Sequence, residues 1–101
     1  MNEDRIAWLE MEIKDLLGVS NVGLYEFVWL LRGRYPQIPF DSARPIAEEA
    51  LRSLLSAGAA RLVLLTWPGQ EAGAGVGPQT LQSSDWDDPR RGEPYVGLTP
   101  I

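Results

Sequence analysis

The hydrophobic positions at the start of the chain recur with the spacing of a helix. Ile6, Leu9 and Ile13 fall on one stripe when successive residues are rotated by about 100°. Gly18 then ends the pattern, as glycine commonly does after the last helical turn. The spacing therefore predicts a first helix over about 4–17.

A second run of apolar residues, over about 21–33, predicts a second helix. Ser20 or Asn21 is a suitable N-cap, and Gly33 is the expected end. This helix is apolar on almost every side. Such a helix is either central in a core or half-buried in an interface, and the sequence leaves both interpretations open.

A third helix is predicted after the connector "RYPQIPF", whose two prolines forbid helix. We expect it over about 42–57, with Ser42 as N-cap and Pro45 at the third helical position, where a missing N–H has no cost. Gly58 is expected just past its end, as the C′ residue.

The last third of the chain changes from helical to strand-like patterning. A short apolar run predicts a buried strand over about 61–67, and "PYVGLTP" predicts a second over about 94–99. Between them, residues 68–93 are rich in Gly, Gln, Ser and Pro and predict a long flexible loop. The two strands are expected to pair antiparallel. Residues 1–101 therefore predict a single α+β domain.

The stretch "PIAEEALRSLLSAGAARLVLLTW", followed later by "PYVGLTP", joins a leucine-rich helix, a glycine stop and a hairpin. This order resembles winged helix-turn-helix domains across most of the chain, at the level of pattern. The resemblance implies a three-helix bundle followed by a two-stranded antiparallel hairpin, with 68–93 as the wing. It also implies that the third helix occupies the position that reads the major groove in DNA-binding members.

Composition removes several kinds of chemistry. The chain has no Cys and no His, so thiolate nucleophiles, imidazole bases and the ligands of common zinc sites are absent. We predict no enzyme activity, no catalytic residue and no cofactor. The lack of disulfides favours a cytoplasmic protein, and no apolar run approaches the roughly 18 residues that a membrane span needs.

Two loop motifs are weak candidates for ligand sites. Asp85, Asp87 and Asp88 lack the spacing of a calcium loop, so we predict no metal site. The stretch "GAGVGPQT" lacks the Lys-Ser/Thr pair of a phosphate-binding loop. Both are better interpreted as solvated loop.

Charge disfavours nucleic acid as a partner. The net charge is −5, from nine basic and fourteen acidic residues, and an acidic chain is repelled by phosphate unless its basic groups share one face. Residues 85–93 carry four acids and two bases. A DNA-binding regulator, dimeric through the first helix, stays as the alternative. Its phosphate contacts would be Arg32, Arg34, Arg44, Arg52, Arg90 and Arg91.

Aromatic and acidic residues instead favour a protein partner. Trp86 stands between acids in a polar loop, and tryptophan is enriched at interface hot spots; alternatively it folds back over the hairpin as a lid. Trp8 and Met11 lie opposite the buried stripe of the first helix. They are either covered by another element, such as the C-terminal strand, or exposed as a partner or homodimer surface. The candidate interaction residues are Trp8, Met11, Glu48, Glu49, Asp85, Trp86, Asp87 and Asp88.

The sequence thus predicts a non-enzymatic, acidic protein-interaction module. A specific form would be an immunity- or antitoxin-like neutraliser of a basic partner, with carboxylates in place of phosphates. A scaffold or oligomer subunit is a third, weaker interpretation.

Overall fold

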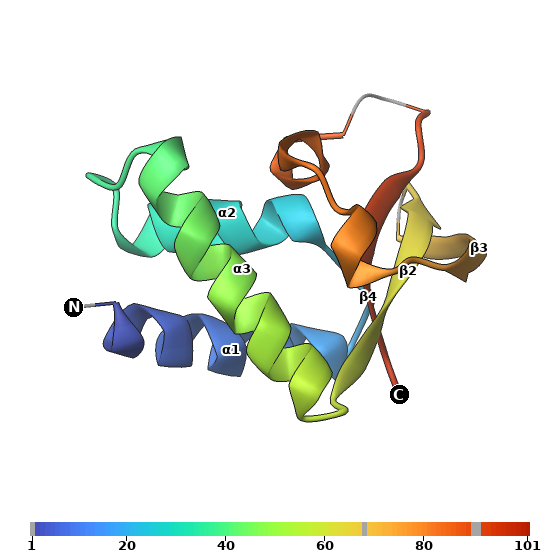
Figure 1. Ribbon diagram of the computed structural model, residues 1–101, viewed down its shortest axis with the longest axis horizontal. Coiled ribbons are helices and arrows are strands. Elements are labelled where there is room, and N and C mark those ends of the chain that lie inside the picture. Colours follow the sequence, from blue (N-terminus) through green and yellow to red (C-terminus); the bar gives the residue numbers. More distant parts are fainter. Residues whose placement is uncertain (1, 68, 90–91) are drawn as a thin grey trace.

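A computed structural model describes residues 2–67, 69–89 and 92–101. The fold is α+β, as expected, with the helices gathered on one side and the strands on the other (Figure 1). The helices are α1 (Glu3–Leu17), α2 (Leu24–Arg34) and α3 (Phe40–Ser56). The strands are β1 (Val22–Gly23), β2 (Ala60–Thr66), β3 (Gln70–Gly75) and β4 (Tyr95–Pro100), and two short 3₁₀ helices are η1 (Pro78–Thr80) and η2 (Ser83–Trp86).

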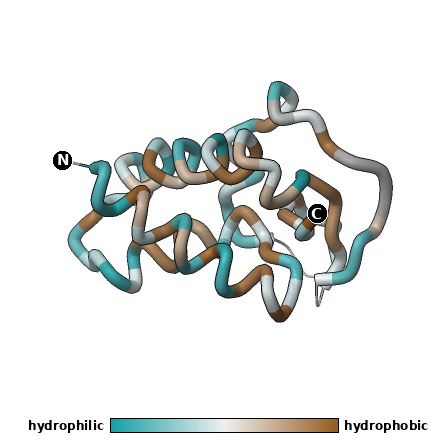
Figure 2. Tube along the Cα trace, turned by 90° about the horizontal axis from the view of Figure 1, so that it is seen from below, coloured by the Kyte–Doolittle hydropathy of each residue, from teal (hydrophilic) through white to brown (hydrophobic). Residues whose placement is uncertain are grey.

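One hydrophobic core lies among the three helices and the sheet. Hydrophobic and hydrophilic positions alternate along the helices (Figure 2), which lets each helix bury one stripe and expose the other. The largest fully buried side chains come from every layer: Leu9 and Ile13 of α1, Phe27 and Leu31 of α2, Leu54 of α3, and Leu65 and Leu98 of the strands.

Helix α2 begins at Leu24, three residues later than predicted. The reason is that Val22 and Gly23 are extended and pair with β4, opposite Leu98 and Gly97. The two backbones approach so closely that a Cβ on Gly97 would lie 2.5 Å from the carbonyl oxygen of Val22. Backbone pairing of Val22 and Gly23 with β4 therefore determines where α2 begins, and the pattern of apolar residues does not.

Helix α3 begins at Phe40, two residues earlier than predicted. Pro39, not Ser42, is its N-cap residue, so Pro45 lies in the second turn and leaves the Asp41 carbonyl without its helical N–H partner. The predicted end is confirmed: Gly58 follows the helix at φ +69°, and its N–H donates to the Leu55 carbonyl.

The sheet is larger than a hairpin. Strands β2 and β4 pair antiparallel from Ala60 opposite Pro100 to Leu65 opposite Tyr95. The prediction of only two strands is wrong, because β1 adds to the free edge of β4 and β3 to that of β2, giving the order β1-β4-β2-β3. The expected pair is therefore the centre of a four-stranded antiparallel sheet.

The segment expected as a structureless loop carries β3, η1 and η2. Strand β3 is held by backbone pairing to β2 and by an ion pair in which Arg61 Nη2 lies 2.7 Å from Glu71 Oε1. The Asn21 side chain donates to the Gly69 carbonyl at 2.9 Å. Glycine and alanine in β3 offer no apolar alternation, so pattern alone does not predict this strand.

Candidate protein-interaction surface

Trp86, the central residue of the predicted hot spot, is part of the core. Its side chain is only 2% exposed and packs edge-to-face against Phe27 of α2, with ring centroids 5.8 Å apart. The expectation that Trp86 stands outside the core is therefore wrong. The alternative interpretation, in which Trp86 folds back as a lid, is closer to the structure. Its ring covers α2, however, and not the hairpin.

The acidic residues around Trp86 do reach the surface. Asp87 and Asp88 are exposed and Asp85 is half-buried, with its Oδ2 accepting the N–H of Gln82 at 2.8 Å. Together with Glu93 these aspartates line a cleft of about 330 Å³. No group of three or more acidic residues is arranged to hold a metal ion in the part of the chain that the structure describes.

A pocket of about 500 Å³ adjoins this cleft, and we call it the aromatic pocket. Four aromatic side chains, two carboxylates and a proline surround it. They come from α2, from the end of β2, and from the segment that leads into β4. The lining residues are Tyr25, Trp29, Trp67, Asp88, Pro89, Glu93 and Tyr95.

The two indoles of the aromatic pocket are largely exposed. Trp67 is 73% exposed and Trp29 is 59% exposed. Trp29 nevertheless has a fixed orientation, because its Nε1–H donates to Asp88 Oδ1 at 2.7 Å. Tryptophan is among the residue types enriched at the hot spots of protein interfaces.

The two tyrosines of the aromatic pocket form its tightly packed floor, which we call the base of the pocket. Tyr25 is buried and packs edge-to-face against both Trp29 and Tyr95, at centroid distances of 5.2 and 5.6 Å. The absence of a side chain at Gly23 makes room for them: a Cβ there would lie 2.6 Å from Tyr25 Cε1 and 2.9 Å from Tyr95 Cε2.

Burial shifts the pKa values of the two tyrosines and of the neighbouring Glu26. Desolvation, with the charge of Glu26 in addition, raises the pKa of Tyr25 to about 12. Desolvation also raises the pKa of Glu26, while the N–H of Gly23, which donates to its Oε2 at 2.6 Å, opposes that shift. Desolvation raises the pKa of Tyr95 as well. Both phenols therefore stay neutral at physiological pH.

The first helix contributes a separate surface. Trp8 is half-buried and packs edge-to-face on Tyr35, the residue after α2, with ring centroids 6.0 Å apart. Met11 is 59% exposed. A shallow hollow of about 410 Å³ is lined by both Trp8 and Trp29. Trp8 is thereby adjacent to the indole that the aromatic pocket exposes.

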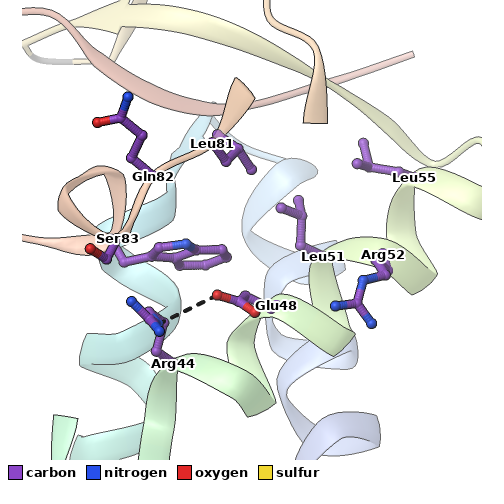
Figure 3. A pocket seen from close by; sticks show the side chains of 9 residues that line it. Arg44, Glu48, Leu51, Arg52, Leu55, Leu81, Gln82 and Ser83 are labelled. Carbon is purple, nitrogen blue, oxygen red and sulfur yellow. Dashed lines mark ion pairs between the residues drawn. The ribbon is translucent and has the colours of Figure 1, made fainter. Parts of the chain in front are cut away.

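The outward face of α3 carries acids that are already paired. Arg44 Nε lies 3.4 Å from Glu48 Oε1 (Figure 3). Glu49 accepts a hydrogen bond from Arg52. These pairs border a pocket of about 450 Å³ between α3 and the segment around Leu81. Glu48 and Glu49 therefore contribute little net negative charge.

The same ion pairs involve two of the arginines that the DNA-binding alternative assigns to phosphate contacts. Arg44 and Arg52 are the two on α3, and each faces a glutamate of its own helix. Arg32 and Arg34 are exposed at the end of α2, with the Arg34 guanidinium 6.0 Å from the Tyr35 ring. The remaining two, Arg90 and Arg91, lie outside the described residues.

Sequence reasoning did not select most of the residues that line the aromatic pocket. The sequence does offer one signal for this pocket: Tyr25 and Trp29 are one helical turn apart on a helix that is apolar on nearly every side. Trp67, Glu93 and Tyr95 are brought to them only by the pairing of β2 with β4.

Comparison of the chain with family models, with curated proteins and with solved structures finds no match. Among the described residues, no helix is both long and apolar enough to cross a membrane.

Proposed function

We propose that this chain is a non-enzymatic, acidic protein-interaction module of winged-helix type that binds a basic protein partner. The observation that carries the proposal is the aromatic pocket. It exposes two indoles directly beside Asp88 and Glu93. Exposed aromatic side chains provide binding energy at interfaces, and neighbouring charges select the partner and speed its association.

The charge of the surface supports a basic partner. Within the described residues, none of the carboxylates of Asp85, Asp87, Asp88 and Glu93 forms an ion pair with a lysine or arginine. With a net charge of −5, the chain attracts cationic surfaces over long range. The specific form that we favour is a neutraliser, in which these carboxylates take the place of phosphates in the partner's own binding site.

The order of elements supports the winged-helix type. Three helices precede the β2 and β4 pair, α3 leads directly into β2, and β3, η1 and η2 lie between these two strands in the sequence. Three helices followed by an antiparallel strand pair are part of what the resemblance implies, whereas β1 and β3 at the sheet edges are not. In this proposal the wing segment binds protein, because its carboxylates and the neighbouring indoles lie on one surface.

Site-specific photo-crosslinking tests the proposal. A benzoylphenylalanine placed at Trp67 should capture basic proteins in a lysate of the source organism, and the same probe at Arg52 on α3 serves as the matched control. We expect adducts with proteins of high isoelectric point from position 67 and not from position 52.

A second arm addresses DNA. Salt-sensitive binding of random duplex DNA at low micromolar concentration, or crosslinking to nucleic acid from position 52, would overturn the proposal in favour of a DNA-binding regulator.

A further inference from the structure

We infer that the aromatic pocket receives the ammonium group of a lysine-type side chain from the partner. The inference rests on the proposed function and names the chemistry that the site recognises. It follows from the combination of aromatic walls with carboxylates at one edge, a combination that suits an organic cation carried on an apolar chain.

The aromatic walls can attract a cation. The faces and edges of Tyr25, Trp29, Trp67 and Tyr95 surround a space of about 500 Å³, in the size range of pockets for small ligands. Indole and phenol faces are electron-rich and attract ammonium groups within about 6 Å of the ring centroid. The hydrogen bond from Trp29 Nε1 to Asp88 holds one of these faces in place before any ligand binds.

The carboxylates select the sign of the charge. Asp88 uses Oδ1 to accept from Trp29, and its second oxygen has no hydrogen-bond donor among the described residues. Glu93 lies on the same rim and is exposed. An anion would be repelled by both groups, and a neutral apolar group would desolvate them without compensation. A cation satisfies the carboxylates and the rings together.

A half-buried carboxylate near the two phenols reinforces this preference. Besides desolvation, the charge of Glu26 raises the pKa of Tyr25 and of Tyr95, so it adds negative potential near both phenols. Because both phenols are neutral, Asp88 and Glu93 are the full charges that the described residues contribute to the pocket lining. A single ammonium group near them would be well compensated.

Indole N–H resonances give a direct measurement. We would titrate the protein with Nα-acetyl-lysine methylamide, with its Nε-trimethyl form and with its neutral Nε-acetyl form, and follow the four tryptophan Nε1–H signals by NMR. The charged probes should shift Trp29 and Trp67 at millimolar concentration and leave the buried Trp86 unmoved. The neutral probe should shift neither.

Matched variants locate the determinants. Asp88→Asn, which keeps an acceptor for Trp29, and Glu93→Gln should each weaken the charged probes by about threefold to tenfold, as should Trp67→Ala. Asp15→Asn removes an exposed acid of α1 that does not line the pocket, and should leave binding unchanged. Dispersion of the amide spectrum verifies that each variant is folded.

Three outcomes overturn the inference: equal binding of the neutral probe, shifts confined to other tryptophans, or equal effects of Asp88→Asn and Asp15→Asn. These outcomes are distinguishable from failure of the proposed function. Protein adducts from position 67 without any ammonium binding would keep the interaction surface and remove only its assigned ligand.

Discussion

The outward face of α3 and the aromatic pocket contain similar residue types in opposite arrangements. On α3, each of two glutamates faces an arginine three or four residues away, so the charges compensate locally. In the aromatic pocket, Asp88 and Glu93 have aromatic rings as neighbours. Local pairing on α3 cancels much of the electrostatic potential at its surface. Carboxylates that lie beside aromatic rings instead leave a negative potential next to an exposed apolar surface. Counts of charged residues do not distinguish the two cases.

The largest effect is expected from Trp86, which lines the pocket beside α3 and packs against Phe27 of α2. Trp86→Ala should reduce the free energy of unfolding by about 3–5 kcal/mol, because a fully buried ring is removed from its contact with Phe27. Trp67→Ala, which removes an exposed indole, is the matched control and should change stability by less than about 0.5 kcal/mol. Urea unfolding measures both, and similar losses would contradict the assignment of Trp86 to the core.

The next effect comes from the base of the aromatic pocket. Gly23→Ala should cost about 1–3 kcal/mol, since the new methyl group collides with the rings of Tyr25 and Tyr95. Gly33→Ala is the control within α2: a Cβ there meets nothing within 4 Å, so helix propensity should raise stability by up to about 1 kcal/mol. Thermal denaturation compares the two, and a neutral Gly23→Ala would contradict the tight packing of the base.

The pH dependence of the free energy of unfolding tests the burial of Tyr25 in the aromatic pocket. The ordinary pKa of tyrosine is 10.0, while that of Tyr25 is raised to about 12. Between these values the unfolded chain has lost a proton that the native protein retains, so the free energy of unfolding should fall as pH rises. Tyr25→Phe should reduce that fall and remove the most alkaline component of the phenolate absorbance titration. An unchanged titration would contradict the burial of this hydroxyl.

The smallest effect is expected on α3. Arg52→Ala breaks a surface pair whose side chains are 66% and 53% exposed, and it should change stability by less than about 0.5 kcal/mol. Chemical denaturation at low and high salt tests this. A larger, salt-sensitive loss would mean that the pair holds α3 in place and does more than neutralise its surface.

The three helices and their C-terminal ends were the parts of the fold best anticipated from sequence, whereas the starts of α2 and α3 were not. The period of the apolar residues defined α1, and Gly58 marked the end of α3, because these features depend on local geometry. The edge strands were not anticipated. Val22 and Gly23 join β4 by backbone hydrogen bonds, and β3 contains glycine and alanine with no side-chain pattern.

The candidate site was anticipated only in part. The acids near Trp86 were identified from their density in one segment, and they do border the surface that we propose. The role of Trp86 itself could not be read locally: polar neighbours indicate an exposed position, but a 3₁₀ turn directs its ring against Phe27. Trp67 and Tyr95 depend on strand pairing between distant segments, which no local pattern encodes.

The central claim is that the carboxylates of the aromatic pocket, and not the acidic content of the whole chain, bind the partner. An oligolysine peptide tests it with two variants of equal net charge, Glu48→Gln with Glu49→Gln on α3 and Asp88→Asn with Glu93→Gln at the aromatic pocket. Isothermal titration at moderate salt should show the second pair weakening the affinity by about threefold or more relative to the first. Equal weakening by the two pairs would mean that the peptide responds to net charge alone, and would contradict the account.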